Sequence, residues 1–329
     1  MTISGSLLSF IGAPTRPVSA STTPSTENSS VTTTTATLPS GSSILVTDAL
    51  AVSAQPWLVH FVARALRPQP ASGSHHHQQQ QQMSSSALTA NGHTYGAAGG
   101  AGTGKRKVLV LGVREREEWW TGVLKKSGIQ LAADRTSGHF DFLSLSDPSV
   151  PLSESFARIR DTLLERTSAD EEGGVDALIV LDDVSALAWM GHDLREVLRW
   201  WNGLRSLLAK SQATLLTLQH YAPAPSAGLE EDPADTHLFR SLLQRSDIWL
   251  QVEPLGGGTA GAASSTAGEI SVHLAPSYLP IPPFAIDPSC GALSASGPRA
   301  RPFWVDEAAG GVEIGVKGRE RPGGAGKWA

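Results

Sequence analysis

Six short apolar runs, separated by helical patterns, constrain the fold of this chain more than any other feature of its sequence. Several of them have an unbroken apolar centre, as expected for strands that are buried on both faces of a sheet. The runs are residues 43–50 (SILVTDAL), 107–113 (KVLVLGV), 140–145 (FDFLSL), 176–184 (DALIVLDDV), 213–220 (ATLLTLQH) and 247–255 (DIWLQVEPL). Because helical patterns alternate with the runs, they predict an α/β fold: a mostly parallel sheet with helices on both faces.

Amphipathic helices are predicted in the intervals between the runs. The helical segments are residues 53–66, 116–128, 153–167, 193–210 and 235–246. Ser53 and Pro56 favour a helix start, and Gly128 favours a helix end. A further run at 268–274 (GEISVHL) predicts an antiparallel strand at the edge of the sheet, paired with 247–255.

Biased composition divides the chain around this α/β domain, which is expected to span residues 42–275. Residues 1–41 are rich in Ser, Thr and Pro and cannot bury enough apolar surface to offset the entropy of ordering, so they predict a disordered tail. A low-complexity insertion rich in His, Gln and Gly occupies residues 68–105. Residues 276–329 are rich in Pro and Gly and are expected to be mostly irregular, with one short strand at GVEIGV.

Bulk properties exclude several classes of protein. The only cysteine is Cys290, so a disulfide framework within the chain is excluded and a reducing compartment is expected. No apolar run has the length of a membrane span, and no membrane association is predicted. The net charge of -5 gives no overall basic signal for nucleic acid, although it allows a local basic patch.

One glycine-rich stretch has the spacing of a phosphate-binding loop. Gly99, Gly104 and Lys105 match G-x-x-x-x-G-K. Such a loop leaves a strand and enters a helix, so that backbone N–H groups converge on the phosphates. Here the stretch instead precedes a strand, and Arg106, the next residue, cannot bind magnesium. An autonomous ATPase that uses Gly99 to Lys105 is therefore the alternative interpretation, not the favoured one.

The place where a phosphate-binding loop belongs, between the first strand and its helix, reads TDALAVSAQPW. It has no glycine for close approach of a phosphate and no lysine to neutralise it. Asp182 and Asp183 end a later strand, like the acidic strand ends that orient magnesium in nucleotide hydrolases. The favoured interpretation is that Asp182 or Asp183 caps the next turn and hydrogen-bonds nearby backbone. His220 ends the fifth run, where sensor residues lie in such folds or where a polar residue simply lines the rim. No catalytic, cofactor-binding or metal-binding residue is predicted.

Two pairs of adjacent tryptophans are a further signal. They are Trp119 with Trp120 and Trp200 with Trp201. Neighbouring residues on a helix cannot face the same way, so one of each pair is expected in the core and the other at the surface or on a partner. Tryptophan is enriched at interfaces, which favours an assembly. Of these four residues, Trp201 is the predicted interface residue.

The ordered set of blocks resembles the Elongator complex protein 6 family over roughly residues 42–275. The blocks are SSILVTDAL with VHFVARAL, KVLVLGVREREEWW, FDFLSL, ALIVLDDVSALAWMGHDLREVLRWWNGLR, TLLTLQHYAP, DTHLFRSLLQRSDIWLQVEPLGGG and GEISVHL. The resemblance implies a RecA-like α/β domain that lacks the phosphate-binding loop.

The same resemblance implies a non-catalytic role. Members of this family join Elongator subunits four and five in a ring-shaped heterohexamer, part of a complex that modifies the wobble uridine of certain tRNAs. The expected partners are those two subunits, the remainder of the complex and tRNA, in the cytoplasm and also in the nucleus. No cofactor is expected on this chain alone, and ATP is expected only at ring interfaces. The candidate tRNA or subunit contacts are Arg114, Arg116, Asp182, Asp183, Trp201 and His220.

Overall fold

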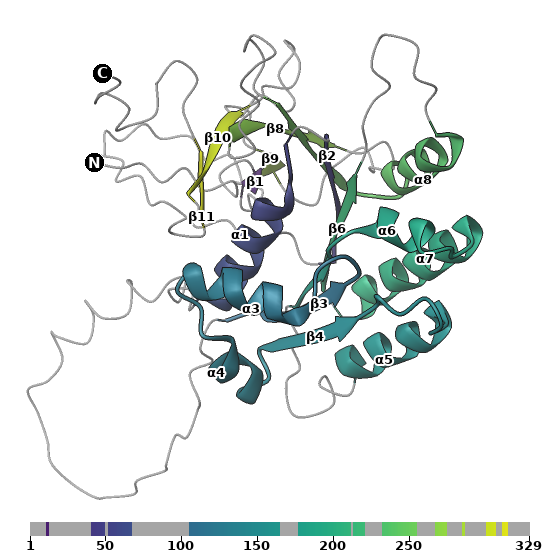
Figure 1. Ribbon diagram of the computed structural model, residues 1–329, viewed down its shortest axis with the longest axis horizontal. Coiled ribbons are helices and arrows are strands. Elements are labelled where there is room, and N and C mark those ends of the chain that lie inside the picture. Colours follow the sequence, from purple (N-terminus) through teal and green to yellow (C-terminus); the bar gives the residue numbers. More distant parts are fainter. Residues whose placement is uncertain are drawn as a thin grey trace, which may run out of the picture.

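The computed structural model (Figure 1) is a layered α/β structure around one large sheet. The structure describes residues 11–12, 41–49, 52–67, 105–164, 177–211, 213–220, 232–254, 267–274, 285–286, 301–306 and 311–314. Most of the predicted tail at 1–41 and of the insertion at 68–105 lies outside the described residues.

The large sheet has nine strands in the order β11-β10-β8-β7-β2-β6-β5-β3-β4. The strands are β2 (Ser43–Asp48), β3 (Lys107–Gly112), β4 (Phe140–Ser144), β5 (Ala177–Leu181), β6 (Thr214–His220), β7 (Ile248–Glu253), β8 (Ala267–Leu274), β10 (Arg301–Asp306) and β11 (Gly311–Ile314). From β7 to β4 every pair is parallel, whereas β8, β10 and β11 are added in antiparallel fashion. A separate two-stranded pair joins β1 (Ile11–Gly12) to β9 (Ala285–Ile286).

Helices cover both faces of the sheet, as Figure 1 shows. One face carries α1 (Gln55–Leu66), α3 (Glu117–Lys126) and α4 (Leu131–Thr136), and the other carries α5 (Leu152–Leu164), α6 (Val184–Trp189), α7 (Leu194–Ser211) and α8 (Pro233–Leu243). Alternate residues of each central strand point to opposite faces. In β2, Val46 belongs to the core under α1, whereas Leu45 belongs to the core under α7. This explains why the strand runs are apolar throughout.

The predicted fold class is confirmed. The first strand of the domain, β2, lies in the middle of the sheet between β6 and β7, with β5, β3 and β4 beyond β6. This is the RecA-like arrangement that the family resemblance implies. The predicted pairing of 268–274 with 247–255 is also confirmed, because β8 lies antiparallel to β7.

The predicted end of the domain at residue 275 is corrected by β10 and β11. Both strands come from the segment expected to be mostly irregular, and β10 pairs with β8, so β8 is not the edge strand. Phe303 of β10 is fully buried and packs edge-on against Trp57 of α1, with ring centroids 5.1 Å apart. The short strand expected at GVEIGV is present as β11. No described helix combines the length and the apolar character that crossing a membrane requires.

Gly112, at the end of β3, allows the chain to turn tightly toward α3. A Cβ atom at this position would lie 2.6 Å from the carbonyl oxygen of Glu115 and would overlap the ring of Phe142. We expect Gly112→Ala to lower the free energy of unfolding by about 1–3 kcal/mol, measured by urea denaturation.

Gly122 offers the matched control for this substitution. It lies within α3 with nothing near the position of a Cβ atom, so Gly122→Ala should raise the stability by about 0.5–1 kcal/mol. A Gly112→Ala chain as stable as the unaltered protein would contradict the described packing of the turn after β3.

Candidate functional site at the carboxyl edge of the sheet

Three charged side chains meet where β2, β5 and β6 end. Asp48 is the last residue of β2, His220 is the last residue of β6, and Asp183 follows β5. Asp48 and His220 are register partners on adjacent parallel strands. Ligands of open α/β sheets bind at this carboxyl edge, so these residues define the candidate site.

His220 lies between the two carboxylates. Its Nδ1 contacts Oδ1 of Asp48, and its Nε2 lies 3.2 Å from Oδ2 of Asp183. Both aspartates are fully buried, whereas the His220 side chain is 18% exposed. Burial lowers the pKa of His220, but the hydrogen bonds and charges of Asp183 and Asp48 outweigh it and raise the pKa to about 10. His220 is therefore a cation at neutral pH, held by two anions.

Asp48 and Asp183 also accept backbone hydrogen bonds beside helix starts, and Asp183 is itself the N-cap residue of α6. Asp48 Oδ2 accepts a hydrogen bond from the backbone N–H of Ala54 at the start of α1, at 2.7 Å. Asp183 Oδ1 accepts from the N–H groups of Ser185 and Ala186 at the start of α6, at 2.9 and 3.2 Å. The exposed N–H groups of a helix start carry partial positive charge, which favours an anion there. The predicted capping role of Asp183 is confirmed.

Asp182 has a different role from its neighbour. Its carboxylate accepts hydrogen bonds from the backbone N–H groups of Val113, Arg114 and Glu115, at 2.7, 3.2 and 3.0 Å. Burial raises its pKa to about 6, although these three donors favour the charged form and oppose the rise. Asp182 thus holds the turn that follows β3, rather than capping the turn that follows its own strand.

Arg114 reaches the same cluster from that turn. Its Nη1 lies 2.8 Å from Nε2 of His220, and its Nε lies 3.5 Å from Oε1 of Glu115. An imidazole nitrogen that donates to Asp183 cannot also accept from a guanidinium. With His220 protonated, this contact places two positive charges side by side, next to the carboxylates of Asp48, Asp183 and Glu115. The Arg114 side chain is 47% exposed, so part of its guanidinium is open to solvent.

Trp189 covers the outer side of the cluster and was not predicted as a site residue. It ends α6, and its ring lies parallel to that of His220, with centroids 6.3 Å apart and planes 7° apart. It is 62% exposed. The only hint in the sequence is a lone aromatic residue six positions after Asp183, which indicates neither exposure nor stacking.

The interface prediction for Trp201 is wrong, because this side chain is fully buried within the chain. Its indole N–H donates to the hydroxyl of Thr217 at 3.0 Å. Trp200 is also buried. Helix α7 packs against α5 and α8 as well as against the sheet, so more of its surface is buried than a single apolar stripe. For the other pair the expectation holds in part: Trp120 is buried, whereas Trp119 is half-buried and packs against the core.

Arg116 does not join the cluster in the described contacts. It stands at the N-cap of α3 and is exposed. Of the six candidates, Arg114, Asp182, Asp183 and His220 therefore meet at one edge, and Arg116 and Trp201 do not.

Lys105 lies at the opposite edge of the sheet. Its ammonium group pairs with Asp134 Oδ1 at 2.7 Å. The next residue, Arg106, donates to the carbonyl oxygen of Ala177 and to the hydroxyl of Thr214, which stand at the starts of β5 and β6. Gly99 and Gly104 lie outside the described residues.

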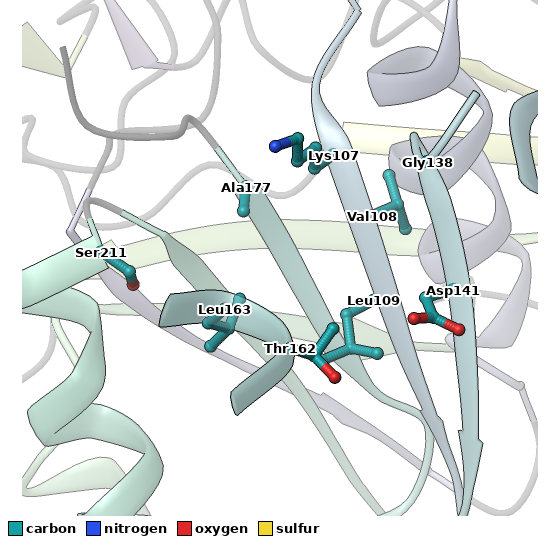
Figure 2. A pocket seen from close by; sticks show the side chains of 9 residues that line it. All are labelled: Lys107, Val108, Leu109, Gly138, Asp141, Thr162, Leu163, Ala177 and Ser211. Atoms are coloured by element: carbon teal, nitrogen blue, oxygen red, sulfur yellow. The ribbon is translucent and has the colours of Figure 1, made fainter. Parts of the chain in front are cut away.

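Two hollows of the described surface lie outside this cluster. Figure 2 shows a cavity of about 20 Å³ along β3, lined by Lys107, Val108, Leu109, Gly138, Asp141, Thr162, Leu163, Ala177 and Ser211. It offers room for about one water molecule. An open groove of about 540 Å³ runs between α5 and α7. Among the described residues, no group of His, Cys, Asp and Glu could hold a metal ion.

Comparison with known proteins gives likenesses among solved structures only. The sequence matches no family model and no curated protein. Among solved structures, the chain is similar to a KaiC-like protein from the hyperthermophilic archaeon Pyrococcus horikoshii OT3, with 8% identity, a TM-score of 0.49, and coverage of 86% of this chain and 92% of that chain. A likeness at this level carries no argument about function.

Proposed function

We propose that this chain is a non-catalytic RecA-like subunit of a heterohexameric ring within the Elongator complex. It would support modification of the tRNA wobble uridine through assembly and tRNA binding. The proposal joins the RecA-like strand order to the ordered sequence blocks that resemble the Elongator complex protein 6 family. Its partners would be Elongator subunits four and five, the remainder of the complex and tRNA.

The observation that carries the non-catalytic part is the carboxylate at the start of α1. In a phosphate-binding loop, the N–H groups between the first strand and its helix face the phosphates. Here Asp48 Oδ2 accepts from the N–H of Ala54 at 2.7 Å, and Ser53 Oγ accepts from the N–H of Gln55 at 3.1 Å. An anion of the chain itself thus stands where a nucleotide phosphate would bind.

The charges around Asp48 are also poorly suited to nucleotide hydrolysis. The nearby cation, His220, is already paired with Asp48 and Asp183. The oxygens of Asp182 accept from backbone N–H groups, and those of Asp183 face backbone N–H groups and His220, so neither of these two carboxylates is open to magnesium and water. These residues do not fit a bound nucleotide phosphate, and we propose that any ATP in the ring binds at interfaces between subunits.

The position of Lys105 disfavours the alternative, an autonomous ATPase that uses Gly99 to Lys105. A phosphate-binding lysine must reach the carboxyl edge of the sheet, whereas Lys105 lies at the amino edge and pairs with Asp134. Its carbon chain cannot cross the length of β3.

The test is a native pull-down of the full chain with a tag, followed by identification and stoichiometry of the partners. We expect two further RecA-like chains in equal amounts. Recovery of this chain alone would overturn the ring proposal.

A hydrolysis assay tests the non-catalytic part separately. We expect the purified chain to show no ATP turnover above background, with or without Lys105→Ala. Robust turnover that Lys105→Ala abolishes would overturn this part and restore the alternative.

A further inference from the structure

Trp189 has an open aromatic face at the carboxyl edge. Among the tryptophans whose side chains the structure describes, it is the only exposed one, at 62%. An exposed indole leaves apolar surface in contact with water, which is unfavourable, and it contributes little to the core. Its position therefore calls for an explanation outside the packing of the domain.

The ring of Trp189 has an aromatic neighbour, the ring of His220. One side lies parallel to the ring of His220, with planes 7° apart. His220 is itself fixed by Asp48 and Asp183, and Asp183 caps the short helix that ends at Trp189. Trp189 and His220 are thus both positioned through Asp183. An aromatic ring that is already positioned loses less conformational entropy when a ligand stacks on it.

Arg114 stands beside this platform. Its Nη1 lies 2.8 Å from the same imidazole that Trp189 stacks on, and its side chain is 47% exposed. The carboxylates below are buried and already compensated by His220 and by backbone N–H groups. What faces solvent is therefore an aromatic plane with a guanidinium next to it.

We propose that Trp189 and Arg114 form a binding site for an unpaired RNA nucleotide, whose base stacks on Trp189 while its phosphate contacts Arg114. Aromatic faces next to basic side chains are how proteins hold single-stranded nucleic acid. A base inside a duplex has both faces covered and cannot stack in this way. The site deepens the proposed function, on which it rests, by giving tRNA binding a place and a mode.

A cationic side chain of a protein partner fits this surface less well. A cation is attracted to an aromatic face, but here the charged ring of His220 lies parallel to that of Trp189, with centroids 6.3 Å apart, and disfavours a further cation on Trp189. Arg114 adds a further positive charge at the side. A ligand with a neutral plane and an anionic group suits both features.

The test is a fluorescence anisotropy titration of the full chain with a labelled oligouridylate of about eight nucleotides. We expect Trp189→Ala to weaken binding at least about fivefold, and Trp189→Phe to retain most of it. Arg114→Gln should weaken binding and reduce the slope of log K against log salt by about 0.7. Lys126→Gln removes one exposed positive charge at the far end of α3 and serves as the matched control, with binding unchanged.

Three results would overturn the site: equal binding by Trp189→Ala and the unaltered chain, equal binding of a duplex of the same length, or competition by uridine monophosphate as strong as by the oligonucleotide. The last would indicate a free nucleotide as the ligand. The pull-down is repeated with Trp189→Ala to separate the two proposals. Partners retained with RNA binding lost would support the site, and RNA binding that depends on Trp189 without any partners would leave the site standing and refute the ring.

Discussion

Replacing His220 with leucine will lower the free energy of unfolding by about 3–5 kcal/mol near pH 7. The substitution removes the cation that lies between Asp48 and Asp183, both of which are fully buried. Two carboxylates are then left without their counter-charge in an environment that penalises charge. The measurement is urea denaturation followed by far-ultraviolet circular dichroism.

The stability that His220 contributes depends on pH, and its sign follows from the raised pKa. The folded chain holds the His220 proton more tightly than the unfolded chain, because its pKa rises from 6.5 to about 10. The contribution is therefore fully present below pH 6.5 and is lost as the pH rises toward 10. The difference in stability between the unaltered chain and His220→Leu should shrink over that range.

A triple variant separates the lost charge from lost packing. Asp48→Asn and Asp183→Asn remove the two negative charges but keep oxygen acceptors for the helix starts. Combined with His220→Leu, they should recover most of the stability, to within about 1–2 kcal/mol of the unaltered chain. If His220→Leu alone costs nothing, the ion-pair cluster does not hold this edge together.

Trp201→Ala will also destabilise the chain by about 3–5 kcal/mol. The side chain is fully buried on the sheet-facing side of α7, so its removal leaves a cavity. The hydroxyl of Thr217 loses the indole N–H that donates to it at 3.0 Å. Thermal and urea denaturation of the full chain measure the loss.

Trp189→Ala is the matched control for this effect. Its side chain is mostly exposed, so the same change of residue should cost within about 0.5 kcal/mol. A small effect at Trp201 together with a large one at Trp189 would contradict the described burial of both residues.

The strands could be predicted from the sequence because buried parallel strands need unbroken apolar runs. Every run named in advance forms a strand, from β2 to β7. The short helices α4 and α6 were not predicted, because six residues are too few to show helical periodicity. The strands β10 and β11 stand among Pro and Gly, and β10 is placed by pairing with β8, which local sequence does not encode.

The site could be predicted only in part. Asp182, Asp183 and His220 follow from their positions at strand ends, because the carboxyl ends of parallel strands share one edge. The pairing of His220 with Asp48 requires the strand order, which places β6 beside β2. The exposure of Trp189 and the burial of Trp201 depend on which helices lie beside α6 and α7, and residue periodicity within one helix does not contain that information.

The imidazole of His220 also connects the two helical layers. Asp48 holds the N-cap residue of α1 on one face of the sheet, Asp183 caps α6 on the other, and His220 contacts both carboxylates from the strand between them. One side chain at the carboxyl end of β6 therefore links the helical layers on both faces of the sheet. Because the two contacts share one side chain, we expect a change that weakens one of them to weaken the other as well.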